Sequence, residues 1–350
     1  YARTWGTNAI TIDSNGLNFQ SSDDTYIVDY DTAGQALNLV YSGATVGWTP
    51  SSDIVNALEP TPPTTQLAVF AYGDTGSSVS LKNLVNSSGV VAADVTGVGT
   101  ARKLLAATNY GGDKALFAYG NTGSKVSMSN LVNNVGVIGT DVTGVGSARS
   151  NCTGINYGVG LAIIGYGLTS EIVGVTNLVN SSGVIASDVS AVGTARYSPG
   201  AANYGVGLAA FAYGFTGSAL SIKNLVNSSG VVSADVTGVG TGRGQMGAAG
   251  YGGDKGVFAY GSNIAGAFLS VKNLMSNTGT IAADVSGVGN AKNSLGAARY
   301  GGDKAIFGYG EDSGGRASIT NLCNNLGVIA ANVSGVGTAR NGIAAAAYGY

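Results

Sequence analysis

Histidine is absent from this chain of 350 residues, and charged residues make up only 10% of it. Histidine is the commonest general base and metal ligand near neutral pH, so its absence argues against the usual forms of hydrolytic and metal-dependent catalysis. The formal net charge is −2. Because nucleic-acid binding relies on clustered positive charge, we expect no nucleic-acid partner.

Long apolar runs and cysteines are also scarce. No apolar run reaches the roughly 18 residues that a membrane-spanning helix needs, so we expect no membrane insertion. The two cysteines, Cys152 and Cys323, stand where other copies of an internal repeat carry apolar residues such as Leu105 and Val85. This placement predicts two buried free thiols rather than a catalytic pair.

Motifs for cofactors and metals are missing as well. The glycines of the GVGTAR segments are not followed by the long helix that a phosphate-binding loop requires. The acidic residues are not clustered as they are in a calcium-binding loop. We expect no cofactor, no metal ion and no catalytic residue, so the sequence does not predict an enzyme.

The sequence is instead dominated by a repeat of 47 residues, present in six copies. A tyrosine in a Tyr-Gly pair marks each copy, at Tyr72, Tyr119, Tyr166, Tyr213, Tyr260 and Tyr309. A second tyrosine keeps the same spacing, at Tyr110, Tyr157, Tyr204, Tyr251, Tyr300 and Tyr348. So regular a period indicates a module that buries its apolar face only against neighbouring copies, with both tyrosine series packed inside.

Four apolar runs of strand length lie within one copy, and glycine-containing turns separate them. In the second copy they cover residues 114–119, 126–132, 136–142 and 149–156. This pattern predicts a four-stranded antiparallel meander. Six such meanders predict an all-β, six-bladed β-propeller. A parallel β-helix with two rungs per copy is the main alternative, but the two halves of a copy do not resemble each other.

The repeat resembles the kelch family of propellers. Each copy has an arginine or lysine opening a strand, then a small-residue run such as LLAATNYGGDK, then an apolar strand closing on glycine, as in KAIFGYG. The opening residues are Arg102, Arg149, Arg196, Arg243, Lys292 and Arg340. Tyr-Gly replaces the family's double glycine, and the later tryptophan is missing. The resemblance spans residues 67–350 and implies a kelch-like fold, but no kelch function.

Residues 1–49 lie outside the repeat and alternate as short strands. Strands are predicted at 9–12, 26–30 and 36–41, with a turn at Ser14 to Gly16. The segments YARTWGTNAITI and ALNLVYSGATVGW resemble a small β module of phage tail-fibre and virion appendage proteins. That module normally has strands before its YAR segment, so we expect the chain to begin inside it.

A proline-rich stretch at 50–66 follows the module. It holds Pro50, Pro60, Pro62 and Pro63, and only Pro199 lies elsewhere. Proline stiffens an extended chain, so these residues predict a semi-rigid linker. The predicted organisation is therefore a β module at 1–49, a linker at 50–66 and a six-repeat propeller at 67–350.

One acidic residue recurs in almost every copy, eight residues before the arginine or lysine. The series is Asp94, Asp141, Asp188, Asp235 and Asp284, with Asn332 in the sixth place. A catalytic acid pair occurs once in a site, whereas one acid per copy is a feature of repeat architecture. We expect these carboxylates to bond turn amides or the nearby arginine.

Function is expected where the copies differ, in the loop after each Tyr-Gly pair and in the neighbouring connection. In a meander these two segments emerge on the same face, and loops on a rigid scaffold commonly carry recognition. The candidate binding residues are Lys103, Tyr197, Phe215, Phe268, Asp312 and Arg316.

The resemblance of residues 1–49 implies a bacteriophage virion protein, a tail fibre or appendage that attaches to the host surface. Its partners would be a host cell-surface glycan or protein and other virion proteins, and it would be a homo-oligomer, a trimer if it is a fibre. Two alternatives stay open: a purely structural virion component, such as a tail nozzle or capsid decoration, and a secreted glycan-binding or glycan-active propeller.

Overall fold

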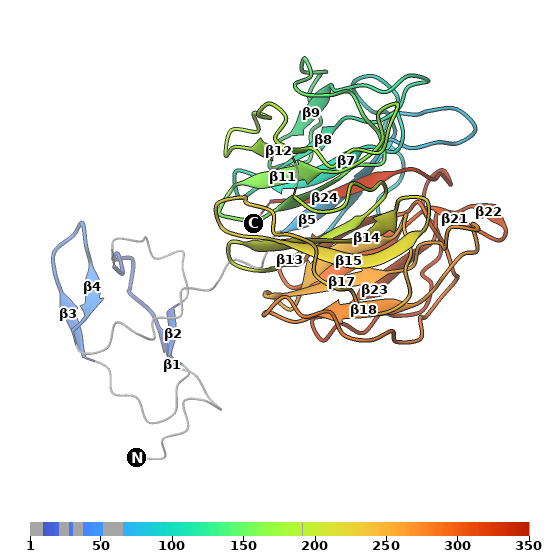
Figure 1. The fold of residues 1–350 in the computed structure, drawn as a ribbon. Coiled ribbons are helices and arrows are strands. Elements are labelled where there is room, and N and C mark those ends of the chain that lie inside the picture. The colour runs from blue at the N-terminus through green and yellow to red at the C-terminus, as the bar shows by residue number, and fades with distance from the viewer. Residues whose placement is uncertain (1–9, 21–27, 31–37, 52–65, 191, 350) are drawn as a thin grey trace. The chain divides into compact units, whose positions relative to one another are not determined.

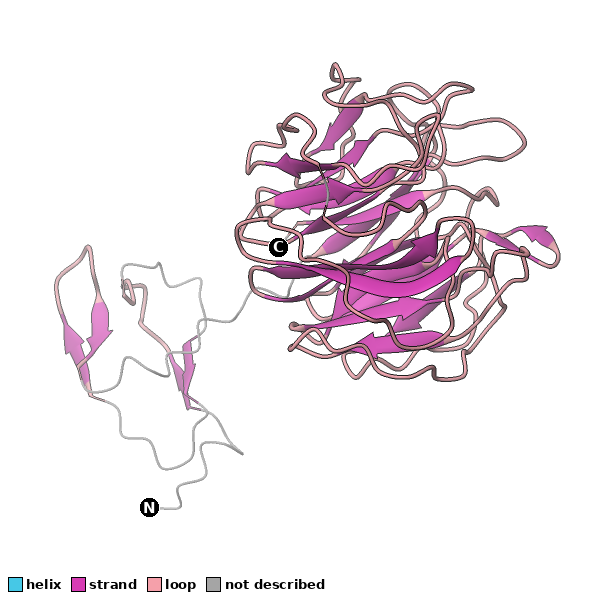
Figure 2. Ribbon diagram, viewed as in Figure 1, coloured by secondary structure: helices cyan, strands magenta, loops and turns pink. Residues whose placement is uncertain are grey.

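The computed structural model describes residues 10–20, 28–30, 38–51, 66–190 and 192–349. The chain divides into two compact units, Tyr1–Thr64 and Thr65–Tyr350. Figure 2 shows strands and loops, and the described residues contain no helix, so the all-β prediction is confirmed for them. It follows that no helix in the described parts is long and apolar enough to cross a membrane.

The described residues of the first unit form two short antiparallel strand pairs. Strand β1 (Ile10–Ile12) pairs with β2 (Val28–Tyr30), and β3 (Leu39–Tyr41) pairs with β4 (Trp48–Pro50). The predicted turn after β1 is present, because Leu17 N donates to Ser14 O and both Asn15 and Gly16 have positive φ. Residues 9, 26–27 and 36–37 of the predicted strands lie outside the described residues, and so do residues 52–65 of the predicted linker.

The second unit contains six three-stranded antiparallel sheets. Three of them are β24–β5–β6 (Ala344–Tyr348, Leu67–Ala71, Lys82–Val85), β7–β8–β9 (Ala106–Tyr110, Lys114–Ala118, Ser129–Val132) and β10–β11–β12 (Thr153–Asn156, Ala162–Gly165, Thr176–Val179). The others are β13–β14–β15 (Gly200–Gly205, Leu208–Phe215, Ala219–Val226), β16–β17–β18 (Gly247–Tyr251, Lys255–Ala259, Lys272–Met275) and β19–β20–β23 (Gly296–Tyr300, Lys304–Gly308, Thr320–Cys323). A small hairpin, β21 (Glu311–Asp312) with β22 (Gly315–Arg316), extends the last copy.

The middle strand of each sheet is the most buried. Strand β8 reads KALFA, and every residue after Lys114 is buried. A continuous apolar run of this length suits a strand that is covered on both faces. The first strand instead alternates: in β7, Ala106 and Tyr110 are buried, whereas Ala107 and Asn109 are partly exposed.

The predicted third strand, at 136–142 in the second copy, is reduced to isolated bridges. In the first copy, Val85 bridges Val91 and Lys82 bridges Val95. Between these bridges the Asn83 side chain donates to Ala92 O at 2.9 Å. The amide therefore takes a ladder position that backbone groups would fill in a regular strand, and the sheets have three strands rather than four.

The run that we assigned to the end of each copy belongs to the next sheet. Strand β7, at the end of one copy, pairs with β8 of the following copy. In the same way the C-terminal strand β24 pairs with β5 at the start of the unit. The register runs from Ala344 opposite Ala71 to Tyr348 opposite Leu67. Figure 1 shows β24 in red beside β5 in blue. The first strands are neighbours in the order β24, β7, β10, β13, β16, β19 and again β24.

The core lies between sheets rather than within them. One cluster joins Tyr110 and Ala118 of one sheet to Ala162 and Ile164 of the next. Six clusters of this kind are present in the described residues, one for each pair of successive sheets. Each copy thus buries its apolar face against its neighbours, as the repeat predicts.

Candidate functional site

A buried cation lies at each contact between successive sheets, which we call a junction. The five arginines and Lys292 do not open the strands as predicted, because each lies four residues before the first strand of its sheet. All six are 0% exposed. Each lies over the Tyr-Gly tyrosine of the preceding copy, and the guanidinium carbons are 4.0–4.4 Å from the ring centroids. Each arginine also donates through Nη2 to an asparagine Oδ1 at 2.6–2.7 Å. The cation thereby ties two sheets together.

The recurring aspartates complete these junctions. Asp141 accepts from the Thr100 hydroxyl at 2.6 Å and from Asn130 Nδ2 at 2.9 Å, and it lies 4.0 Å from Arg102 Nη1. Burial acts to raise the pKa of Asp141, but the hydrogen bonds from Thr100 and Asn130 outweigh it and lower that pKa. The prediction that these acids bond turn amides or an arginine is confirmed. The arginine is not the one that lies eight residues after the acid. It is the arginine of the preceding copy, such as Arg102 for Asp141, and Arg340 of the last copy takes this place for Asp94.

Both tyrosine series are buried, as expected. Tyr119 has a φ of 61°, and its hydroxyl donates to Val145 O at 3.1 Å. Burial raises the pKa of Tyr119 to about 12. A left-handed φ is strained for a non-glycine residue, so the surrounding packing must hold this tyrosine in place.

The loops after the Tyr-Gly pairs lie against the connections, as expected for segments that share a face. Lys103 and Asn121 exchange two backbone hydrogen bonds of 3.0 and 2.8 Å. The candidates Lys103 and Arg316 meet at Asp74, which is only 4% exposed. Arg316 Nη2 lies 2.8 Å from one Asp74 oxygen, and Lys103 Nζ bonds the other. The hydrogen bond from Lys103 lowers the pKa of Asp74.

Sequence reasoning missed Asp74, which organises this ion cluster. The loops of the first and second copies read DTGS and NTGS, so Asp74 differs from Asn121 by a single group. That difference was the available signal. The residues of the cluster come from three copies, and the sequence alone does not place Arg316 beside Asp74.

The other candidates divide into separate groups. Phe215 belongs to strand β14 rather than to a loop, and it is only 3% exposed, so its ring offers no free face. It packs on the half-buried Tyr197 with ring centroids 5.5 Å apart. Asp312 accepts from Asn290 Nδ2 at 2.9 Å, and Phe268 is half-buried and bridges Ser262. Among the described residues, no hydrogen bond or ring contact joins the Tyr197–Phe215 pair to Asp74.

Six backbones meet in a cyclic set of hydrogen bonds just after the cations. Leu104 N donates to Gly342 O, and each following member donates to the one before it, at 2.8–3.1 Å. The members are Leu104, Asn151, Ser198, Gln245, Ser294 and Gly342, and all have φ between 50° and 58°. A left-handed residue at the same place in every copy lets the six chain segments bond to one another in a circle. We call this set the backbone ring.

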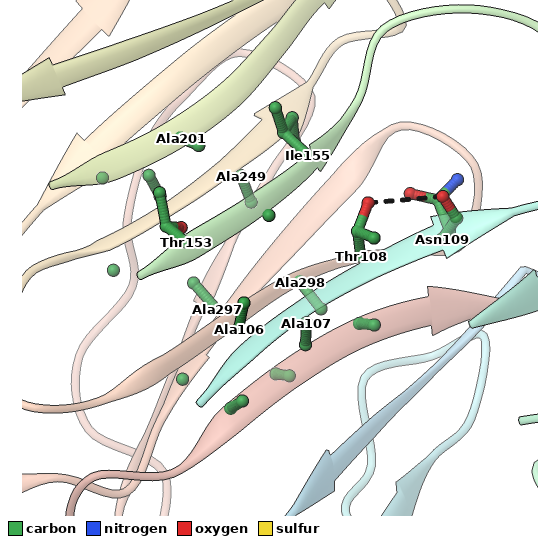
Figure 3. A pocket seen from close by; sticks show the side chains of 18 of the residues that line it. Ala106, Ala107, Thr108, Asn109, Thr153, Ile155, Ala201, Ala249, Ala297 and Ala298 are labelled. Atoms are coloured by element: carbon green, nitrogen blue, oxygen red, sulfur yellow. Dashed lines mark hydrogen bonds between the residues drawn. The ribbon is translucent and has the colours of Figure 1, made fainter. Parts of the chain in front are cut away.

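A cavity of about 360 Å³ extends from the backbone ring along the first strands of all six sheets. Figure 3 shows short side chains from different sheets around it, among them Ala107, Ala201 and Ala297. The small residues of runs such as LLAATNY leave this space open, because strands with longer side chains would fill it. Polar side chains gather near the far ends of the strands, at Asn109, Asn156, Asn203 and Arg299.

The two cysteines are poorly suited to act as reactive groups, although Cys152 lines the cavity. Both are free and buried, as predicted. Burial raises the pKa of Cys152, and it raises the pKa of Cys323 to about 11. A thiol with a raised pKa is a weak nucleophile near neutral pH. In the parts of the chain that the structure describes, no group of three or more metal-binding side chains is present.

Comparison with known proteins adds no family assignment. No protein-family model matches this chain, and no curated protein matches its sequence.

Proposed function

We propose that residues 67–350 form a six-bladed, kelch-like β-propeller in which each three-stranded sheet is one blade. Three observations support this interpretation. The first strands are neighbours in a cyclic order, the C-terminal strand pairs with the first sheet, and the backbone ring has six members, one from each copy. Pairing the last strand with the first blade closes a ring by main-chain hydrogen bonds.

This propeller acts as a non-enzymatic recognition module that binds a host cell-surface glycan or protein through its variable loops. One contrast carries the proposal: the junctions repeat nearly the same hydrogen bonds, whereas the loops beside them differ in length and charge. The Asp74 cluster belongs to the variable part, and Arg316 in it remains 40% exposed. Loops held on a rigid scaffold are well suited to recognition.

The recurring acids support a role without catalysis. Each aspartate of the series accepts a hydroxyl hydrogen bond of 2.6 Å from the preceding connection. These carboxylates therefore stabilise the junctions and are not free to act as an acid and base pair. The proposal assigns neither a cofactor nor a metal to the chain.

The proposed setting is a phage virion, in which the chain is part of a tail fibre or related appendage. The resemblance of residues 1–49 to a tail-fibre module supports this setting. A homo-oligomer, trimeric in a fibre, would present several loop faces together. Weak individual contacts would then suffice, because multivalency strengthens binding by roughly 10² to 10⁴.

The test is to incubate the labelled chain with a panel of bacterial strains and with their extracted surface polysaccharides. Saturable binding that is lost in Arg316→Ala and Phe268→Ala supports the proposal. Val206→Ser is the matched control, because Val206 is 90% exposed on a hairpin at the other end of the strands. Release of oligosaccharide would instead indicate a glycan-active enzyme. Absence of binding to every strain would favour a structural virion component.

A further inference from the structure

One cation interrupts an otherwise uncharged cavity. Arg299 carries the only formal charge among the described residues that line it. The equivalent positions, each just before the second tyrosine of a copy, hold Asn109, Asn156, Asn203, Gly250 and Ala347. These side chains are neutral amides or very small groups, so no carboxylate of the lining neutralises the guanidinium.

The atoms around Arg299 are incompletely bonded. Its Nη2 donates to Gly302 O at 2.5 Å, but its Nε has no hydrogen-bond partner among the described residues. The Oδ1 atom of Asn203 is also without a partner there, and Asn203 is only 6% exposed. A buried polar atom without a hydrogen-bond partner destabilises the fold, because it has lost its bonds to water. A ligand that supplied both missing partners would offset this loss.

Gly250 makes room for these two side chains at one point. A Cβ atom there would lie 2.2 Å from Asn203 Oδ1 and 3.0 Å from Arg299 Cδ. The free acceptor and the arginine therefore adjoin each other across the glycine. Strands β13, β16 and β19, which carry the three residues, are consecutive in the cyclic order.

We propose that this cavity binds a small hydroxy acid of monosaccharide size, with its carboxylate on Arg299 and a hydroxyl donating to Asn203. The carboxylate supplies an acceptor for Nε, and guanidinium groups bind carboxylates in a favourable planar geometry. The hydroxyl supplies the donor that Asn203 Oδ1 lacks. The volume of about 360 Å³ falls in the range of roughly 300–1,000 Å³ that is typical of ligand pockets.

Charge near the site favours an anion. Burial lowers the pKa of Arg299 and Asp303 opposes that change, but arginine stays protonated at neutral pH. Asp303 already bonds Lys304 at 2.9 Å, so it is partly neutralised. The apolar and small lining around the guanidinium weakens dielectric screening, which strengthens its attraction for a carboxylate.

This site goes beyond the proposed function, because it lies at the opposite end of the first strands from the variable loops. Arg299 is next to the hairpin between β19 and β20, whereas the backbone ring lies before the strands begin. A variant can therefore lose ligand binding in the cavity without losing cell binding at the loops, so the two proposals can fail independently.

The experiment measures binding of D-glucuronate to the full chain by isothermal titration calorimetry, with D-glucose as the neutral counterpart. We expect saturable glucuronate binding that is at least tenfold tighter than glucose binding. Arg299→Gln removes the charge, and Asn203→Asp places a carboxylate of equal size beside the guanidinium. Both changes should weaken glucuronate binding at least tenfold, whereas Arg316→Gln at the loops should leave it unchanged.

The Asn203→Asp variant guards against misfolding, because an aspartate paired with Arg299 should preserve or raise the melting temperature. Equal glucuronate binding by wild type and Arg299→Gln overturns the proposal. So does failure of the wild-type chain to bind glucuronate or the smaller hydroxy acid lactate.

Discussion

Five junctions hold an arginine, and the sixth holds Lys292. At the arginine junctions an aspartate accepts from a threonine or serine hydroxyl. At the lysine junction Asn332 replaces the aspartate, and it accepts from the backbone of Asn290, which replaces the threonine. The cation with fewer donors thus occurs together with a neutral partner. In this one junction the cation, its acidic partner and the hydroxyl donor are all replaced together.

The two kinds of junction differ in how well the buried charge is bonded. Arg149 donates to Tyr166 O, Ser147 O and Asn177 Oδ1, and it lies 4.0 Å from the Tyr119 ring centroid. Lys292 donates to Asn321 Oδ1 at 2.9 Å, and its Nζ lies 4.9 Å from the ring centroid of Tyr260. Burial lowers the pKa of Lys292 to about 7, although Asp312 opposes the change. The lysine junction can therefore lose its charge near neutral pH, whereas the arginine junctions cannot.

The largest expected effect comes from removing the cation at each kind of junction. Arg149→Met should lower the free energy of unfolding by about 3–5 kcal/mol, because it leaves buried acceptors and Asp188 without their partner. At pH 6, Lys292→Met should lower the free energy of unfolding by less than half of this amount. The reason is that the buried ammonium has few partners, so removing it also removes an unfavourable buried charge. Urea unfolding followed by circular dichroism measures both values. Equal losses would contradict the distinction between the junctions.

The next effect is a dependence of stability on pH between about 7 and 9 to which Lys292 contributes. Lys292 has a folded pKa of about 7 and an ordinary value of 10.5, so between these values the unfolded state holds the proton more tightly. The free energy of unfolding should therefore rise as pH increases above 7, and this gain is lost again as pH falls through 7. The limiting slope is about 1.4 kcal/mol per pH unit.

The measurement compares wild type with Lys292→Met from pH 6 to pH 9. Other titrating groups, such as the buried cysteines, are present in both proteins, so their contributions cancel in the difference. We expect the difference to be flat below pH 7 and to grow by roughly 2 kcal/mol up to pH 9. A difference in unfolding free energy that stays constant from pH 6 to pH 9 would show that folding does not lower the pKa of Lys292.

A smaller effect is expected from converting the lysine junction into the arginine type. In an Asn290→Thr background, Lys292→Arg and Asn332→Asp should each be unfavourable or neutral alone, but favourable together. In the Lys292→Arg variant the new arginine has no carboxylate partner. In the Asn332→Asp variant the new aspartate lies beside the ammonium of Lys292, which makes few hydrogen bonds. A double-mutant cycle should give a coupling of about 1–2 kcal/mol. Additive effects would mean that the two positions do not interact, and Arg149→Lys with Asp188→Asn is the matched reverse cycle.

The sequence predicted the period, the three strands that form each sheet and the burial of both tyrosine series, because these follow from local apolar patterns. It also predicted a further regular strand in each copy, where the structure has only isolated bridges. It also exposed Lys292 and Asn332 as departures from the repeat. It did not show that Asn321 joins them, donating to Asn332 while accepting from Lys292. The acid nearest to Lys292 in sequence, Asp284, instead bonds Thr241. Contacts between copies depend on how sheets stack, and local patterns do not encode that step.

The candidate site was predicted only in part, because its residues come from different copies and local patterns do not show which of them meet. A variable loop identified Arg316 and the neighbouring connection identified Lys103, and the structure joins both residues through Asp74. Phe215 was assigned to a loop because it follows a Tyr-Gly pair, yet β14 continues through it and Tyr197 covers its ring. The cavity around Arg299 could not be predicted, because the strands that line it come from all six copies.

The smallest expected effect belongs to the Asp74 cluster, where the buried acid meets cations that remain partly exposed. Arg316→Gln should lower the free energy of unfolding by less than about 1 kcal/mol, because an exposed partner gains little from pairing and salt screens it. Lys103 remains bonded to Asp74 in this variant, so the acid keeps one cation. The loss should shrink further in 1 M salt, whereas the loss in Arg149→Met should persist because its charge is fully buried. Urea unfolding at low and high salt tests this directly. An Arg316→Gln loss as large and as insensitive to salt as that of Arg149→Met would mean that the loop cluster is part of the structural core rather than a surface available for recognition.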